Sequence, residues 1–341
     1  MTIYPTKGEI IDAITQVENL PDDLIGYKCA MGAYMPLYYQ GGFCLVFKML
    51  KENAPTLALR VWFAKVDDII DRNKTIAAYI QQHPQEYLVK IKLYEKGLKV
   101  PSDQGLVLLD MMTMEWVEGE NLKTYIKNIL ESKTSYDSKK DKLISLANKM
   151  LGIFESMHQL GMSHGDLQHT NILISLQGNP KLIDYDSLYF PNSKYTKHIT
   201  DGYSEYQHPS RRKSKEANER TDYFSELIIY LAIMSYAEDN DLWKKYAIDA
   251  LDYSILFTAE ELQDIENSVL YNEIKKKNDV LSHLCQLLYL FLSKDDIDDI
   301  ERPFTSYEGI SIINDNYCIE CGYKFINISD RFCICCGTKR M

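Results

Sequence analysis

The sequence shows no long apolar run, no secretory pattern in its first residues and no excess of positive charge, the features that direct a chain to a membrane or to nucleic acid. Its longest strongly apolar stretch, Leu227 to Ala237, falls well short of the roughly 20 residues that a bilayer span needs. The first residues, MTIYPTKGEI, hold no cationic segment followed by an apolar run, so we expect no secretory signal. With a formal net charge of -11, neither nucleic acid nor a membrane surface is expected as the main partner. These absences predict a cytoplasmic protein.

Cysteine is also scarce until the end of the chain, where five of the eight cysteines crowd together. This uneven distribution argues against a disulfide framework spread through a secreted fold. Cys29, Cys44 and Cys285 stand alone in apolar surroundings and are predicted to be buried thiols.

The terminal cysteines form two C-x-x-C pairs, CIEC and CICC, separated by eleven residues and each followed by a glycine. Two such turns can place four thiolates around Zn²⁺ at about 2.3 Å. The segment resembles a zinc ribbon over residues 314–341, which implies a structural zinc site that docks a protein partner. The four ligands implied are Cys318, Cys321, Cys333 and Cys336. Cys335 is the additional thiol, and a redox or disulfide pair is the alternative.

Strand patterns dominate the first part of the chain and helix patterns the second, which predicts an α+β fold. A helix is expected at Gly8 to Leu20, followed by five strands between residues 28 and 117 with a helix at about 68–82 after the third. After Gly119 we expect two short strands, at 171–175 and 180–184, among helices at 142–161, 221–236, 241–251, 258–270 and 280–292. Residues 301–316 have the composition of a linker.

The stretch HGDLQHTNIL, followed by KLIDYD, supplies three groups suited to phosphoryl transfer. Asp166 can accept or orient the proton of a substrate hydroxyl. Asn171 and Asp184 offer the oxygen ligands that Mg²⁺ requires, and two short strands between them would return both to one place.

This constellation resembles that of the eukaryotic-like protein kinases, and the likeness extends over residues 38–291. QGGFCLVFKM resembles their glycine-rich strand–turn–strand, and LALR stands where kinases have V-A-I-K. TMEWVEGENL is similar to the hinge that binds adenine through backbone groups, and DYFS matches the start of the central C-lobe helix.

The resemblance implies a two-lobed kinase fold with a β-rich N-lobe over 1–117, including an N-terminal helical extension, and a mainly helical C-lobe over 118–305. It implies ATP and Mg²⁺ as cofactors, with Asp166 and Gln168 as catalytic positions. The nucleotide-binding positions that it implies are Gly41, Gly42, Val46, Ala58, Arg60, Met114, Glu115, Val117, Asn171, Leu173 and Asp184, of which Asn171 and Asp184 hold Mg²⁺.

A bacterial branch of the same superfamily is similar in more detail. Its members combine an N-terminal Gly-Glu helix, the hinge M-E-W-V-x-G, a D-Y-D metal motif and Y-Q-H-P in the activation segment. This chain has all four, at Gly8–Glu9, Met114–Gly119, Asp184–Asp186 and Tyr206–Pro209.

Four positions depart from the kinase pattern. Gly165 replaces the arginine that pairs with a phosphorylated loop, which predicts catalysis independent of that modification. Gln168 replaces the lysine near the transferred phosphoryl group, and Arg60 replaces the phosphate-binding lysine. Asp186 replaces the glycine of D-F-G. An acidic partner for Arg60 is not assigned; its candidates are Asp67, Asp68 and Asp71.

The leading interpretation is a serine/threonine protein kinase, autophosphorylation included, whose protein substrate the sequence does not identify. One alternative is a small-molecule kinase, because H-G-D is also the spelling of aminoglycoside and choline phosphotransferases. The other is a nucleotide-binding pseudokinase that serves as a scaffold. His164 is interpreted as a structural core histidine. The basic run RRKSK at 211–215 is interpreted as a solvated loop, with contact to an acidic substrate as the alternative.

Overall fold

The computed structural model describes residues 4–65, 68–103, 105–212 and 216–304 of the chain. The predicted zinc ribbon and Asp67 lie outside the described residues. The chain divides into two compact units, Met1–Glu118 and Gly119–Met341. Each unit is described by itself below.

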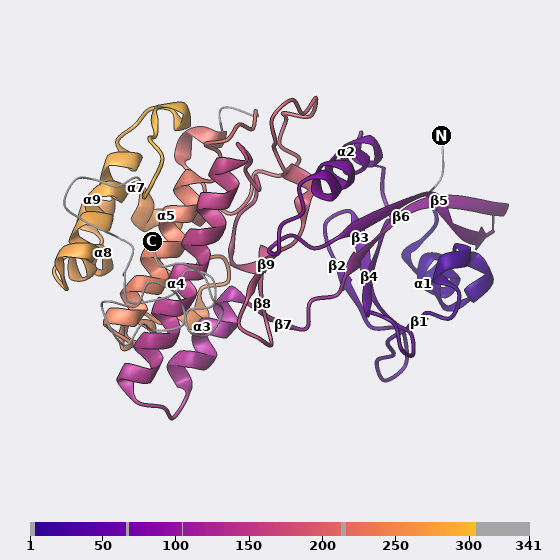
Figure 1. Ribbon diagram of the computed structural model, residues 1–341, viewed down its shortest axis with the longest axis horizontal. Helices are drawn as coiled ribbons and strands as arrows, with labels where there is room; N and C mark the ends of the chain where they lie inside the picture. Colours follow the sequence, from indigo (N-terminus) through magenta and orange to yellow (C-terminus); the bar gives the residue numbers. More distant parts are fainter. Residues whose placement is uncertain (1–3, 66–67, 104, 213–215, 305–341) are drawn as a thin grey trace. The chain divides into compact units, whose positions relative to one another are not determined.

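The first unit is built on a six-stranded antiparallel sheet, drawn in Figure 1. Its strands are β1 (Lys28–Cys29), β2 (Tyr38–Gln40), β3 (Cys44–Leu50), β4 (Leu57–Trp62), β5 (Ile91–Ser102) and β6 (Gly105–Glu115). The order is β1-β3-β4-β6-β5, and β2 also pairs with β3. The five predicted strands are present. The two-residue β1 was missed because so short a strand shows no alternation.

Two helices complete the first unit. Helix α1 (Lys7–Thr15) begins at a capping box, in which Glu9 N–H donates to Thr6 Oγ1 at 3.2 Å and Thr6 N–H to Glu9 Oε2 at 2.7 Å. Its buried isoleucines join the apolar face of the sheet in one core. The sequence predicted that this helix ends at Leu20. In the structure the helix ends at Thr15, and a 3₁₀ turn follows. Helix α2 (Ile69–Gln82) lies near β5.

The second unit is mainly helical, as predicted. Its helices are α3 (Leu122–Glu131), α4 (Tyr136–Gln159), α5 (Tyr223–Glu238), α6 (Leu242–Lys245), α7 (Ala259–Gln263), α8 (Val269–Ile274) and α9 (Asp279–Leu292). Helix α5 is buried on nearly every side and packs against α4 and α9. This central position explains why its sequence is apolar all round.

Two helices expected at 241–251 and 258–270 are each broken. The first ends at Lys245, and Ala247 adopts a left-handed φ of 49° before a short 3₁₀ turn. The second is split into α7 and α8, because Asp264 leaves the helical region with φ -141° and ψ 62°. Apolar spacing alone does not reveal such breaks.

A small sheet in the second unit positions the predicted transfer loop, the segment from His164 to Asn171. Strands β7 (Gly119–Asn121), β8 (Ile172–Ser175) and β9 (Pro180–Leu182) pair in that order and are labelled in Figure 1. The sequence predicted β8 and β9 but not β7, whose three residues are polar or glycine. A Cβ atom at Gly119 would lie 2.0 Å from the carbonyl oxygen of Ile174, so this pairing requires glycine.

The start of the predicted linker is packed against the helices. The ring of Phe304 lies 5.0 Å from that of Tyr230 and 6.3 Å from that of Phe154. Arg302 Nε donates to His158 Nδ1 at 2.6 Å. Residues 301–304 therefore belong to the second unit. Across the described ranges, no helix combines the length and apolarity of a membrane span.

We predict that Gly119→Ala lowers the free energy of unfolding of the second unit by about 1–3 kcal/mol, because the added methyl group forces β7 away from β8. Urea denaturation measures this loss. Gly42→Ala is the control, since a Cβ there meets no atom within 4 Å. A Gly119 variant as stable as the parent would contradict the close approach.

Candidate active site

The loop from His164 to Asn171 is held by a buried carboxylate. Asp222, directly before α5, is fully buried. It accepts hydrogen bonds from the backbone N–H of His164 and, at 3.1 Å, from that of Gly165. Burial raises the pKa of Asp222 to about 6, and this carboxylate fixes the loop relative to the central helix.

His164 has the structural role that the sequence predicted. Its ring is buried, and Nε2 lies 2.8 Å from the carbonyl oxygen of Ile183. The backbone N–H of Asp166 lies 3.3 Å from Nδ1. The proton is thus assigned to Nε2, and the imidazole links the transfer loop to the strand that precedes Asp184.

Gly165 is required by its surroundings. Its φ is +81°, and a Cβ would lie 2.2 Å from the carbonyl oxygen of Ser187. No side chain fits this position without movement of the backbone, so the absence of the kinase arginine is a steric necessity of this loop.

Asp166 and Asn171 meet inside this loop. Asn171 Nδ2 donates to the Asp166 carbonyl at 2.8 Å and to Asp166 Oδ2 at 3.2 Å. Gln168 Nε2 also reaches Oδ2, at 3.3 Å. Both Asp166 Oδ1 and Gln168 Oε1 are buried with no hydrogen-bond partner among the residues described. An unused carboxylate oxygen is what a proton acceptor in this loop needs.

Asp184 lies within electrostatic reach of this pair. The pKa of Asp166 is raised to about 6, first by burial and then by the negative charge of Asp184. Arg211 and the hydrogen bonds from Asn171 and Gln168 oppose this rise. Asp184 is exposed and has a left-handed φ of 65° at the start of the turn Tyr185–Ser187. The structure therefore gathers the three groups that the sequence singled out.

The basic run after Tyr-Gln-His-Pro differs from its prediction. Arg211, taken from the sequence as part of a solvated loop, is buried with only 4% of its surface exposed. Its guanidinium donates to the Gly165 carbonyl and to Gln207 Oε1. Charge pattern alone missed this residue, because a run of basic residues does not show which of them turns inward.

In the first unit, strand register places several predicted nucleotide-binding residues on one face of the sheet. Val46 is opposite Arg60, and Ala58 is opposite Met114. Since paired residues share a face, these four side chains project together. The alternating residues, such as Leu45 and Phe47, join the core with α1.

Arg60 is buried on a central strand of the sheet. Strand β4 lies between β3 and β6, and Arg60 is 7% exposed. Its guanidinium carbon lies 5.4 Å from the centroid of the Trp62 ring. Of its three candidate acidic partners, Asp68 and Asp71 are exposed and Asp67 lies outside the described residues, so the acidic partner of Arg60 stays unassigned.

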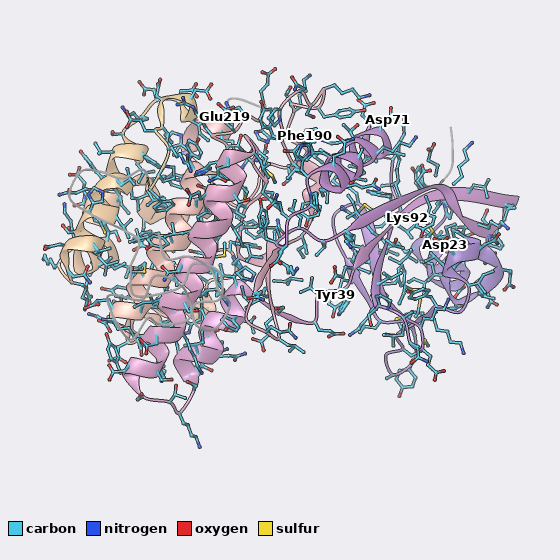
Figure 2. The ribbon with its side chains drawn as sticks, in the orientation of Figure 1. Asp23, Tyr39, Asp71, Lys92, Phe190 and Glu219 are labelled. Atoms are coloured by element: carbon cyan, nitrogen blue, oxygen red, sulfur yellow. The ribbon has the colours of Figure 1, made fainter. Side chains whose placement is uncertain are left out.

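Gly41 and Gly42 form the turn between β2 and β3, with Gly41 N–H donating to the Cys44 carbonyl at 2.9 Å. Tyr39 precedes this turn and is labelled in Figure 2. Its ring lies 6.0 Å from that of Trp116, in the predicted hinge. The hairpin and the hinge segment are thus linked by an aromatic contact within one unit.

The hinge backbone leaves a restricted set of groups for a ligand. Glu115 N–H donates to the Lys90 carbonyl at 3.2 Å, and Trp116 N–H to the Thr56 carbonyl at 3.1 Å. The N–H groups of Glu115 and Trp116 are thus used within the first unit. Val117 follows, at the end of the first unit. Leu173, on β8 of the second unit, is half-buried beside the buried Ile172 and Ile174.

Among the described residues, no group of three or more histidine, cysteine, aspartate or glutamate side chains is arranged to hold a metal ion. The predicted zinc ligands all lie outside those residues. Cys29, Cys44 and Cys285 are buried and reduced, as predicted.

Comparison with known proteins agrees with this geometry. The family model described as "Protein kinase domain" matches residues 40–298, which is most of the chain. The chain therefore belongs to the protein kinase domain family.

Three curated relatives are kinases by name. The "Serine/threonine-protein kinase PknD" of Chlamydia trachomatis serovar D is 28% identical over 152 residues, 35% of this chain and 16% of its own length. The "Dual specificity protein kinase zakA" of Dictyostelium discoideum is 26% identical, over 46% of this chain and 18% of its own length. The "Probable serine/threonine-protein kinase CPE1738" of Clostridium perfringens is 26% identical, over 54% of this chain and 26% of its own length. The chain thus spans less than a third of each relative.

We predict that Asp222→Ala lowers the free energy of unfolding of the second unit by about 2–4 kcal/mol, because two buried N–H groups lose their acceptor. Asp222→Asn keeps one acceptor oxygen, so its free energy of unfolding should fall less than that of Asp222→Ala. Urea denaturation measures both values, and Asp241→Ala, at an exposed aspartate before α6, serves as the control. Equal stability of the Asp222 and Asp241 variants would contradict the anchoring role.

Proposed function

We propose that this chain is an ATP- and Mg²⁺-dependent protein kinase that transfers the γ-phosphate to serine or threonine hydroxyls, its own included. The observation that carries the proposal is the buried Asp166 carboxylate, which has one oxygen fixed by Asn171 and Gln168 and the other unused. The names of the curated relatives support protein serine and threonine as the acceptors.

The residues present fit a magnesium–nucleotide complex. Asn171 uses its Nδ2 on Asp166, so its Oδ1 is the ligand atom, and the exposed Asp184 supplies a carboxylate. A divalent cation would complete this set with phosphate oxygens and neutralise the charge of Asp184. Because that charge raises the pKa of Asp166, the loaded site favours the ionised base.

The proposed roles of the first unit follow from its sheet register. Arg60 would contact phosphates from the same face on which Val46, Ala58 and Met114 would contact the base of the nucleotide. The Gly41–Gly42 hairpin would cover phosphates with backbone N–H groups, and the Glu115 carbonyl and Val117 would bind adenine.

In the transfer step, the acceptor hydroxyl forms a bond to the γ-phosphorus while the bond from that phosphorus to the bridging oxygen of ADP breaks. The hydroxyl proton passes to Asp166. Gln168 keeps a hydrogen-bond donor beside the base but carries no charge. The positive charge that most kinases place here is therefore absent from position 168.

We predict that Asp166→Ala lowers the turnover number for phosphoryl transfer by about 10²–10⁴-fold, because the proton acceptor is removed. Transfer of labelled phosphate from ATP to the chain or to a protein mixture measures this loss. Asp241→Ala should keep the parental rate. Equal labelling by the Asp166 variant would contradict the assignment, and a labelled metabolite without labelled protein would indicate a small-molecule kinase.

We further propose that residues 314–341 form a zinc ribbon that docks a protein partner. The support is the spacing of the two C-x-x-C pairs and the glycine after each. Four thiolates close the coordination sphere, so the ion would be structural, with a folding contribution of about 10 kcal/mol or more.

We predict about one zinc ion per chain in the purified protein and its loss in Cys318→Ser and Cys333→Ser. Cys335→Ser is the matched control, because it removes the neighbouring thiol that is not assigned as a ligand. Elemental analysis by mass spectrometry measures the metal. The zinc ribbon would be overturned if Cys318→Ser and Cys333→Ser both kept the parental zinc content. Loss of zinc in Cys335→Ser alone would also overturn it.

A further inference from the structure

Arg211 joins three segments of the second unit through one guanidinium group. NH2 donates to the carbonyl of Gly165 in the transfer loop and lies 3.0 Å from His198 Nδ1. NH1 donates to Gln207 Oε1, within Tyr-Gln-His-Pro. Arg211 thus contacts both the loop that carries Asp166 and the segment that follows Asp184.

The partners of this guanidinium are themselves fixed. His198 Nε2 lies 3.1 Å from the carbonyl oxygen of Glu216, which assigns the proton to Nε2 and leaves Nδ1 to accept from Arg211. Gln207 is 4% exposed, and its oxygen is taken by Arg211, so the orientation of its amide group is set. Each contact uses the planar fork of arginine, which a lysine cannot reproduce.

Burial lowers the pKa of Arg211, and the charges of three carboxylates of the second unit oppose this effect. Asp222, Asp166 and Asp201 are the carboxylates whose charges act on it. A buried cation is tolerated only with such partners, and removal of one partner is costly. Here all the partners are part of the chain.

We propose that Arg211 is a positioning residue that clamps the activation segment onto the transfer loop, in place of the arginine–phosphate pair of other kinases. Position 165 cannot hold that arginine, because a Cβ atom there would clash with the carbonyl oxygen of Ser187. Arg211 of the activation segment supplies the positive charge instead, and its guanidinium donates to the Gly165 carbonyl of the transfer loop. The proposal rests on the proposed kinase function and explains how the segment is held without phosphorylation.

The test compares Arg211→Met and Arg211→Lys with the parent chain, with Lys294→Ala as the control for loss of an exposed cation. We expect Arg211→Met to lower kcat by about 10²-fold, because the base is displaced relative to the segment. The Kd for MgATP, measured by calorimetry, should stay unchanged. Arg211→Lys should restore part of kcat, and phosphatase treatment of the parent should leave kcat intact.

Three results would overturn the proposal. The first is a kcat of Arg211→Met equal to that of the parent. The second is a loss of kcat when the parent chain is treated with phosphatase. The third is a parallel loss of kcat and of the fraction of chains that bind MgATP, which indicates a purely structural role. If Arg211→Met does not fold, the proposal is judged on the lysine variant, where parental kcat would count against it.

Hydrogen exchange separates this proposal from the proposed function. The amides of residues 164–171 and 198–208 should exchange faster in Arg211→Met than in the parent, whether or not the chain transfers phosphate. If the parent chain has no kinase activity and these amides still exchange faster in Arg211→Met than in the parent, the clamp is supported and the kinase function is rejected. Unchanged exchange in a chain with parental labelling activity would reject the clamp alone.

Discussion

The carboxylate of Asp222 is the constraint on which the second unit depends. It lies fully buried at the start of the central helix and holds two consecutive backbone N–H groups of the transfer loop. Burial of a charge is unfavourable, as its raised pKa shows, and these hydrogen bonds offset part of that cost. The position of Asp166 follows from this attachment, because Asp166 comes directly after the two residues that are held. The same constraint explains why residue 165 is glycine, whose backbone passes too close to Ser187 for a side chain.

The structure places positive charge at positions other than those typical of the protein kinase family. Lysine is absent from position 168 and arginine from position 165, yet a buried guanidinium reaches the loop from Arg211. In the first unit, Arg60 keeps a cation on the central strand β4. Arg60 replaces a point charge by a planar group that lies beside the Trp62 ring, and Arg211 is held at the oxygens of Gly165 and Gln207.

Much of this could be predicted from sequence, and the failures have physical causes. Long helices and strands were found because one buried face gives a clear period, and Asp166, Asn171 and Asp184 because their chemistry fixes their spacing. Short strands such as β7 carry too few residues to show alternation, and the break at Ala247 leaves the apolar spacing intact. Arg211 was misjudged because burial of a cation depends on acceptors far away in sequence, here Gly165 and Gln207. The zinc ribbon stays a prediction.

The central claim is that the groups around Asp166 transfer phosphate to protein hydroxyls. The most direct measurement is to incubate the parent chain with γ-labelled ATP and Mg²⁺ and to identify the labelled product by mass spectrometry. The account predicts phosphoserine or phosphothreonine on the chain or on an added protein, and none when Mg²⁺ is chelated. Binding of MgATP without any labelled product would contradict it and would indicate a nucleotide-binding scaffold.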